Sequence, residues 1–182
     1  MNEIVGMYDN LEEYDNDSRV KSCFFTGHRR IAAKNDKLLM DIKKCISYLY
    51  SIGVREFHSG GAIGFDTLAA TIVIDLKRFH PDMKLVLNLP FHNQACNWSD
   101  SELEYSDFVK KHADEIIYSF DGDVLTKDDA RKYLLKRNRD MVNCSKYGIA
   151  YYSGKSKSGT GYTLRYAKER ACEVENVYDI QK

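Results

Sequence analysis

The chain has 182 residues, and its 27 lysines and arginines balance its 27 aspartates and glutamates, so the formal net charge is zero. This length suits one domain, and a composition of 43% hydrophobic and 30% charged residues is typical of globular proteins. Apolar runs such as 84–90 are far shorter than the roughly 18–20 residues that span a bilayer, and residues 1–20 lack the pattern of a signal peptide. We therefore expect a cytoplasmic protein without a membrane partner.

Beyond residue 20, short apolar runs alternate with segments of helical periodicity. In chain order we expect a strand at Lys21–Thr26, a helix at Asp36–Ile52, a strand at Val54–His58, a helix at Asp66–Phe79, a strand at Lys84–Leu89, a helix at Ser101–His112, a strand at Glu115–Phe120, a helix at Lys127–Cys144, a strand at Tyr147–Tyr152, a helix at Tyr162–Cys172 and a last strand at Asn176–Ile180. Apolar strands that alternate with helices predict a mainly parallel sheet covered on both faces. The sequence thus predicts a Rossmann-like three-layer α/β sandwich in a single domain, with ligands at the carboxyl ends of the strands.

The zero net charge conceals two oppositely charged parts of the chain. Residues 1–20 carry six acidic residues and a single basic one, Arg19, whereas residues 21–182 carry 26 basic and 21 acidic residues. Because the first 20 residues also lack apolar periodicity, we expect a flexible acidic tail at 1–20 and a folded domain at 21–182.

The five cysteines are odd in number, lie far apart and form no CxxC motif. This pattern predicts free thiols in a reducing cytoplasm rather than disulfides or a zinc site. His92 and Cys96 stand four residues apart, but no dense cluster of metal ligands accompanies them. We expect neither a metal ion nor any other cofactor.

The strongest local motif is Ser59-Gly60-Gly61-Ala62-Ile63-Gly64-Phe65-Asp66, which lies between an expected strand and an expected helix. Glycines let backbone amides approach a ligand closely, and the start of a helix adds free N–H groups and a positive dipole, so a phosphate fits this turn. The alternative is a tight turn in which Asp66 complements the helix dipole. The chain has neither a GxGxxG fingerprint after its first strand nor a GxxxxGK[ST] loop, which argues against the common hydride-transfer enzymes and NTPases.

A second glycine motif, Ser158-Gly159-Thr160-Gly161-Tyr162-Thr163, follows the fifth expected strand. Nine lysines and arginines against three aspartates lie just before it, between Lys127 and Lys157. Two such junctions in one sheet, next to a basic segment, favour a shared anion site over two unrelated turns, although a solvated helix face would also explain the charges. Trp98 and the tyrosines at 147, 151 and 152 are candidates either for base stacking or for packing on neighbouring elements.

These motifs, in the order TGHR, SGGAIGFDTLAA, LPF with Trp98, KRNRDMV and GTGYTLRYA, resemble the YpsA-like branch of the SLOG superfamily, which is named for the DNA-processing protein DprA (Smf) and the cytokinin-activating enzyme LOG. The resemblance covers about residues 21–172 and implies a Rossmann-like fold, a nucleotide-type ligand near the glycine motifs, and homodimers. The positions that match the family motifs, and that we therefore expect to bind the nucleotide, are Thr26, Gly27, Arg29, Gly60, Gly61, Gly64, Asp66, Arg137, Asn138, Gly159, Thr160, Gly161 and Thr163. Met141 also matches the motif that contains Arg137.

Two departures from the family pattern bear on function. Arg30 stands where this branch commonly has proline, and Arg165 or Tyr166 stands where LOG enzymes have the glutamate of their phosphoribohydrolase chemistry. A carboxylate near the reacting bond assists glycosidic cleavage, so its absence favours binding over hydrolysis. Asp66, Glu102 and Glu104 are the candidates to replace it.

The resulting hypothesis is a module that senses or sequesters a small nucleotide-type ligand. The first alternative is a LOG-like nucleotide phosphoribohydrolase, whose catalytic residues the sequence does not identify. The second is DprA-like binding of single-stranded DNA, which the balanced overall charge makes the weakest of the three.

Overall fold

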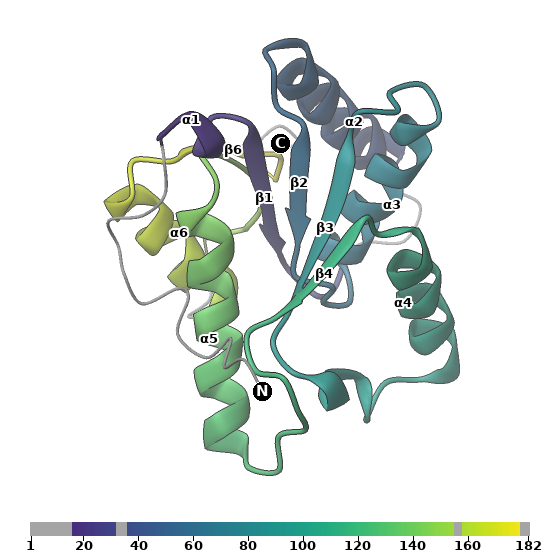
Figure 1. The fold of residues 1–182 in the computed structure, drawn as a ribbon, viewed down its shortest axis with the longest axis vertical. Coiled ribbons are helices and arrows are strands. Elements are labelled where there is room, and N and C mark those ends of the chain that lie inside the picture. Colours follow the sequence, from purple (N-terminus) through teal and green to yellow (C-terminus); the bar gives the residue numbers. More distant parts are fainter. Residues whose placement is uncertain (1–15, 32–35, 155–157, 179–182) are drawn as a thin grey trace, which may run out of the picture.

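The computed structural model describes residues 16–31, 36–154 and 158–178. In these ranges the elements are α1 (Asn16–Arg19), β1 (Ser22–Gly27), α2 (Asp36–Ser51), β2 (Glu56–Ser59), α3 (Phe65–Lys77), β3 (Lys84–Leu89), the 3-10 helix η1 (His92–Ala95), α4 (Asp100–His112), β4 (Glu115–Tyr118), α5 (Lys127–Asn143), β5 (Tyr147–Tyr151), α6 (Gly159–Glu169) and β6 (Glu173–Asn176). The strands form one sheet in the order β4-β3-β2-β1-β5-β6, and each of the five pairings is parallel (Figure 1). The expected Rossmann-like α/β fold is confirmed.

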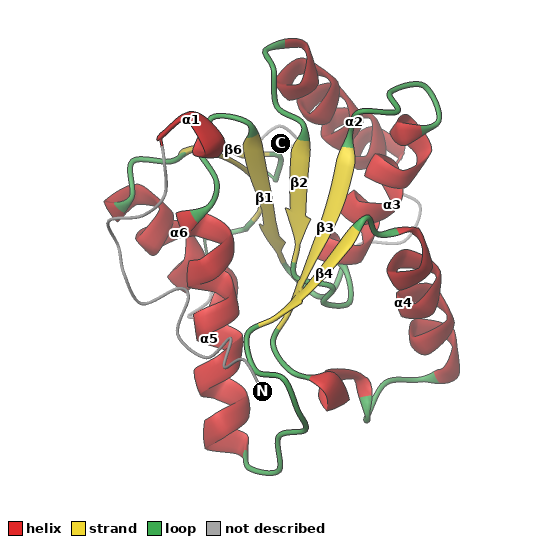
Figure 2. Ribbon diagram, viewed as in Figure 1, coloured by secondary structure: helices red, strands yellow, loops and turns green. Residues whose placement is uncertain are grey.

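Helices cover both faces of the sheet, with α2, α3 and α4 on one side and α5 and α6 on the other (Figure 2). The alternation of side chains along β1 accounts for the two layers. Cys23 and Phe25 are buried in the core that includes α2 and α3, whereas Phe24 is buried against Met141 of α5 and Ala167 of α6. Apolar residues on both faces explain why the strand reads as a continuous hydrophobic run.

The structure shifts the boundaries of the two last elements from their expected positions. Helix α6 begins at Gly159 rather than at Tyr162, because Ser158 caps the helix by accepting a hydrogen bond from Gly161 N (3.3 Å). Strand β6 occupies Glu173–Asn176 rather than 176–180, and residues 179–180 of that expectation lie outside the described residues. The glycine motif at 159–161 is therefore the first turn of a helix and not a loop before it.

The expected acidic tail falls mostly on residues 1–15, which lie outside the described residues. Residues 16–19 form α1, and the Arg19 side chain donates hydrogen bonds to the carbonyl oxygens of Ser145 (3.1 Å) and Arg170 (3.2 Å). This arginine thus joins α1 to the ends of α5 and α6. Among the described helices, none is long and apolar enough to cross a bilayer.

Candidate functional site

A cavity of about 910 Å³ lies at the carboxyl ends of the strands, between β1 and β5, where the strand order reverses. This is the position at which open parallel sheets bind ligands. We call it the junction pocket, and its lining residues are Thr26, Gly27, His28, Arg29, Ala62, Asp66, Lys127, Ala130, Arg131, Leu134, Leu135, Arg137, Asn138, Ser158, Gly159, Thr160, Tyr162 and Arg165. The lining brings together the turns after β1 and β2, the inner face of α5 and the start of α6.

The turn after β2 is held by its own short side chains. Ser59 accepts a hydrogen bond from Gly61 N (3.3 Å) and donates one to Asp66 O (3.0 Å), which closes the turn across its base. Gly64 has a φ of 93°, and a Cβ atom there would lie 2.6 Å from the backbone carbon of Arg29. Only glycine fits this position, because the backbone is left-handed and the neighbouring turn is in contact with it.

Arg137 is the buried cation of the junction pocket. It is only 5% exposed, and its Nη1 donates hydrogen bonds to the carbonyl oxygens of Gly60 and Asn88, the latter at 3.3 Å. Its Nε has no hydrogen-bond partner among the described residues. Burial lowers the pKa of Arg137, while the nearby Asp66 raises it and Arg29 lowers it. The guanidinium therefore joins the turn after β2 to the end of strand β3, and its Nε remains able to donate a further hydrogen bond.

Among the residues that the structure describes, Asp66 is the only carboxylate that lines the junction pocket. Burial raises its pKa to about 6, although Arg137, Arg29 and the backbone of Ala62 and Gly60 all act in the opposite direction. The group is therefore a weaker acid than an exposed aspartate, because its pKa of about 6 lies above the ordinary value of that side chain.

The start of α6 forms the opposite wall of the junction pocket. Gly159 and Thr160 line the pocket. Thr163 is fully buried, and its hydroxyl group donates a hydrogen bond to Gly159 O (2.9 Å) within the helix. Unpaired amides and the positive end of the helix dipole make such a helix start attractive to anions. Arg165, one turn further, adds a full positive charge to this wall.

Positive charge dominates the lining of the junction pocket. It contains the five cations Arg29, Lys127, Arg131, Arg137 and Arg165, against the single carboxylate of Asp66. Other basic residues of the expected basic segment are engaged elsewhere: Lys136 pairs with Asp140 (3.0 Å) and Lys146 with Glu173 (3.3 Å). Leu134 and Leu135 supply an apolar strip between the charges. The pocket thus suits a ligand with both anionic groups and an apolar body.

Eight of the expected ligand residues line the junction pocket: Thr26, Gly27, Arg29, Asp66, Arg137, Asn138, Gly159 and Thr160. The other five, Gly60, Gly61, Gly64, Gly161 and Thr163, lie in the adjoining turns and in α6 but outside the lining. The pocket lining also includes residues that were not among the expected ligand positions: His28, Ser158, Tyr162, Arg165, Leu134 and Leu135, together with Lys127 and Arg131 of the basic segment. The α5 residues that line the pocket include positions 127, 130, 131, 134 and 138. Steps of three and four residues place them on one face of the helix, and this spacing is the signal that could have identified that face.

The remaining candidates lie away from the junction pocket. Trp98 and Glu102 line a separate cavity of about 360 Å³ between α2, α3 and α4, and Glu104 is exposed on α4. Tyr151 stacks on Phe65 with ring centres 5.8 Å apart, so this strand aromatic packs within the fold. Within the described residues, no three His, Cys, Asp or Glu side chains gather in a way that could hold a metal ion.

Comparisons with known proteins agree with this architecture. Residues 23–181 match the YpsA family model, described as the YspA SLOG family. The SPbeta prophage-derived protein YoqJ of Bacillus subtilis is 35% identical over 141 residues, which are 74% of this chain and 80% of YoqJ. A UPF0398 protein of Bacillus cereus is 26% identical over 136 residues, 75% of this chain and 71% of the relative.

Two solved structures of DNA processing protein A share the fold. The protein from Helicobacter pylori, whose structure addresses its single-stranded DNA binding mode, superposes with a TM-score of 0.58 over 87% of this chain and 65% of its own length. The protein from Streptococcus pneumoniae has a TM-score of 0.60 over 84% of this chain and 48% of its own length. This chain spans less than two thirds of either protein. Both proteins are 18% identical to it, so the likeness shows a shared fold and nothing further.

Proposed function

The chain belongs to the YspA SLOG family, and from that premise we propose that it binds a nucleotide or nucleotide-derived phosphate ligand in the junction pocket. The observation that carries the proposal is the concentration of cations there. Four of them are arginines, whose planar forks pair well with phosphate oxygens, and one of these, Arg137, is buried with an unpartnered Nε. The apolar strip of Leu134 and Leu135 gives a base or sugar a surface to pack on.

Thermal unfolding with a panel of ligands tests this proposal. Nucleoside monophosphates, ADP-ribose, cyclic dinucleotides and inorganic phosphate are each added in excess. A ligand at a hundred times its Kd stabilises a protein by about 2.7 kcal/mol, which raises the Tm of a chain of this size by roughly 5–10 °C. We expect such a rise with at least one nucleotide and a smaller one with phosphate alone.

Paired arginine variants make the test specific. Arg131→Gln and Arg165→Gln each remove one cation from the junction pocket, so we expect both to reduce the ligand-induced rise in Tm. Arg78→Gln is the matched control, because Arg78 is exposed outside the pocket, 3.7 Å from Asp75. No rise with any nucleotide, or an equal rise in all three variants, contradicts binding at this site.

A second candidate is single-stranded DNA. It is favoured by the fold shared with DNA processing protein A from Helicobacter pylori and by the exposed cations Arg29, Lys127 and Arg131 at the rim of the pocket. Such binding weakens steeply with salt, because the phosphates that the protein neutralises release counterions. Gel shifts with a labelled oligonucleotide at 50 and 200 mM salt distinguish it from nucleotide binding, which we expect to persist at the higher concentration.

We propose binding rather than hydrolysis, because the described lining of the junction pocket offers a glycosidic bond one carboxylate, and the backbone of Gly60 and Ala62 already bonds to that group. Base release from nucleoside monophosphates, followed by chromatography of the wild type and Asp66→Asn, tests the LOG-like alternative. Asp66-dependent release of base would replace our proposal with the enzymatic one.

Two further parts of the proposal concern the surroundings of the protein. All five cysteines are free, which fits the reducing cytoplasm, and membership of the SLOG superfamily leads us to propose a homodimer. Cell fractionation checks the first part, and sedimentation or light scattering of the full chain checks the second.

A further inference from the structure

A row of buried polar side chains lies between α5 and the sheet, where an apolar core is usual. His58 on β2 and Asn88 on β3 are each 5% exposed; the His58 ring contacts Cys144 at the end of α5, and the Asn88 backbone carbonyl accepts a hydrogen bond from Arg137 of α5. Burying polar groups costs free energy unless they bond to one another, so such a row needs a reason. Neither His58 nor Asn88 lines the junction pocket, and the proposed function makes no use of the imidazole.

The imidazole of His58 is held between an amide and a thiol. His58 Nδ1 lies 3.0 Å from Asn88 Oδ1, and since that oxygen only accepts, Nδ1 carries the hydrogen. The sulfur of Cys144, which follows the last residue of α5, lies 3.7 Å from both ring nitrogens. Equal distances place the sulfur off the line of either N–H bond, so the contact between the sulfur and the ring is not a linear hydrogen bond.

The charges around His58 favour its protonated form. Its Nε2 lies 4.0 Å from the Glu56 carboxylate, which also pairs with Lys84 at 3.7 Å. The negative end of the α5 dipole, where Cys144 stands, also favours the imidazolium, but it opposes a thiolate, so the imidazolium is the group that must stabilise the sulfur anion. Burial lowers the pKa of His58, but Cys144, Asn88 and Glu56 outweigh burial and raise it above its ordinary value. A cation fixed beside a sulfur is the environment that activates cysteine nucleophiles.

We propose that Cys144 is a redox-sensitive modification site, a thiolate paired with the imidazolium of His58, which is oriented by Asn88. The co-reactant is a hydroperoxide. The thiolate sulfur attacks one peroxide oxygen, the S–O bond forms as the O–O bond breaks, and the departing hydroxide or alkoxide takes a proton from the imidazolium. The sulfur loses two electrons to give a sulfenic acid, and the peroxide is reduced to water or an alcohol. Cys144 is partly exposed, so a small oxidant can reach it.

A purely structural role is the competing explanation. Cys144 Sγ lies 3.3 Å from Met141 O, and a neutral thiol donates its hydrogen bond there, as many helix-end cysteines do. In that case His58 serves only to fill the space, and the thiol reacts as an ordinary one.

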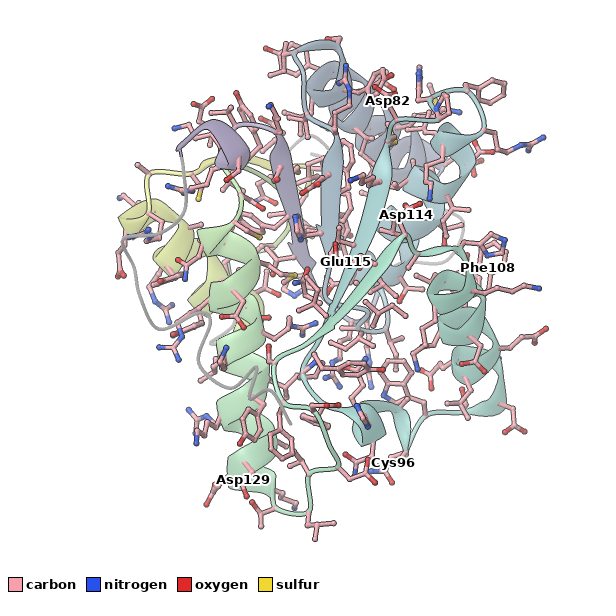
Figure 3. The ribbon with its side chains drawn as sticks, viewed as in Figure 1. Asp82, Cys96, Phe108, Asp114, Glu115 and Asp129 are labelled. Carbon is pink, nitrogen blue, oxygen red and sulfur yellow. The ribbon has the colours of Figure 1, made fainter. Side chains whose placement is uncertain are left out.

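The pH dependence of alkylation separates the two explanations. The protein carries an internal reference in Cys96, which is exposed beside η1 (Figure 3) and makes no hydrogen bond to an imidazole among the described residues. Trypsin releases Cys144 in a peptide of residues 140–146, which contains no other cysteine, and Cys96 in a peptide of residues 85–110. Timed pulses of iodoacetamide at pH 6, 7 and 8, followed by mass spectrometry, give the two rates separately.

An ordinary thiol loses roughly 70-fold in rate between pH 8 and pH 6, because its thiolate fraction falls. We expect the loss at Cys144 to be several-fold smaller than the loss at Cys96 in the same sample. His58→Gln keeps a polar side chain but removes the cation, and we expect it to restore the steep profile at Cys144 while Cys96 is unchanged. Brief exposure to hydrogen peroxide in the presence of dimedone should label the 140–146 peptide in the wild type, far less in His58→Gln, and not in Cys144→Ser.

Equal pH profiles for Cys96 and Cys144 in the wild-type protein, or no reaction of Cys144 with either reagent, overturn the proposal. This comparison needs no variant, so it holds even if His58→Gln folds poorly. It also needs no nucleotide, so its outcome is independent of the ligand proposed for the junction pocket.

Discussion

Replacing Gly60 by alanine gives the sharpest test of how the junction pocket is built. A Cβ atom at Gly60 would overlap the guanidinium of Arg137 and lie 2.8 Å from Asp66 Oδ2. The φ of Gly60 is not positive, so backbone strain is not the obstacle. The effect of Gly60→Ala therefore comes from displacing the buried Arg137 guanidinium and, to a smaller extent, the Asp66 carboxylate.

The expected cost has two parts. Overpacking a buried site costs about 1–3 kcal/mol, and loss of the hydrogen bond from Arg137 to the Gly60 carbonyl costs about 1.5–3 kcal/mol. Because the displaced guanidinium relieves part of the overpacking, we expect a total of about 2–4 kcal/mol, or a fall in Tm of roughly 5–12 °C for a domain of this size.

Gly159→Ala is the matched control, since Gly60 and Gly159 both belong to glycine motifs that are expected from the sequence to bind the ligand. A Cβ atom at Gly159 meets only Asn138 Nδ2 at 3.9 Å, and its φ is not positive either. In the first turn of α6 alanine is the better helix former, so we expect stability to rise by up to about 1 kcal/mol. Urea unfolding of both variants measures the difference, and a Gly60→Ala protein as stable as the wild type refutes the packing argument.

Three further predictions concern stability. Asp66 holds its proton more tightly in the folded than in the unfolded state, because its pKa is raised to about 6, so we expect the wild type to lose about 2 kcal/mol from this group as pH rises from 4 to 7. Urea titrations should show that Asp66→Asn lacks this component, and identical pH dependence would contradict it. Gly64→Ala combines a φ of 93° with contact against the Arg29 backbone, so calorimetry should show a loss of at least about 2 kcal/mol. Arg19→Met removes a hydrogen-bond donor from two carbonyl groups, of which that of Ser145 keeps the Cys172 thiol, so we expect urea unfolding to show a loss of about 1–3 kcal/mol, whereas no loss would place residues 16–19 in the acidic tail.

The sequence was sufficient for the fold because the strands are apolar on both faces. Lys84–Leu89 has the bounds expected of it, since five of its six residues are buried and the proline that follows ends it. Strand β6 was misplaced because its sequence, Glu-Val-Glu-Asn, has one apolar residue, and its pairing depends on backbone contacts with β5 such as Val177 N to Ala150 O (2.9 Å). Strand pairing that depends on backbone contacts with a neighbouring strand is poorly predicted from the local pattern of hydrophobic residues.

The glycine motifs were recognisable, but their separate roles were not. Gly60, Gly61 and Gly64 are conformational and packing positions behind the pocket, whereas Gly159 lies on its surface. The pocket face of α5 was missed as a unit because its charged and apolar members, such as Arg131 and Leu134, read as an ordinary amphipathic helix. Which face of a helix lines a ligand pocket depends on how the helix packs on the sheet, and the local sequence pattern does not specify this packing.

The central position of β1 also has a consequence for the order of folding. Its partner on one side is β5, so Cys23 pairs with Tyr147 across 124 positions of the chain, while β2, β3 and β4 add on the other side in sequence order. Contacts of such sequence separation form late, because a long loop must close first. During synthesis the segment up to β4 therefore waits with one edge of β1 unpaired until β5 emerges. The junction pocket needs the start of α6 as well, so a ligand can stabilise only the completed domain.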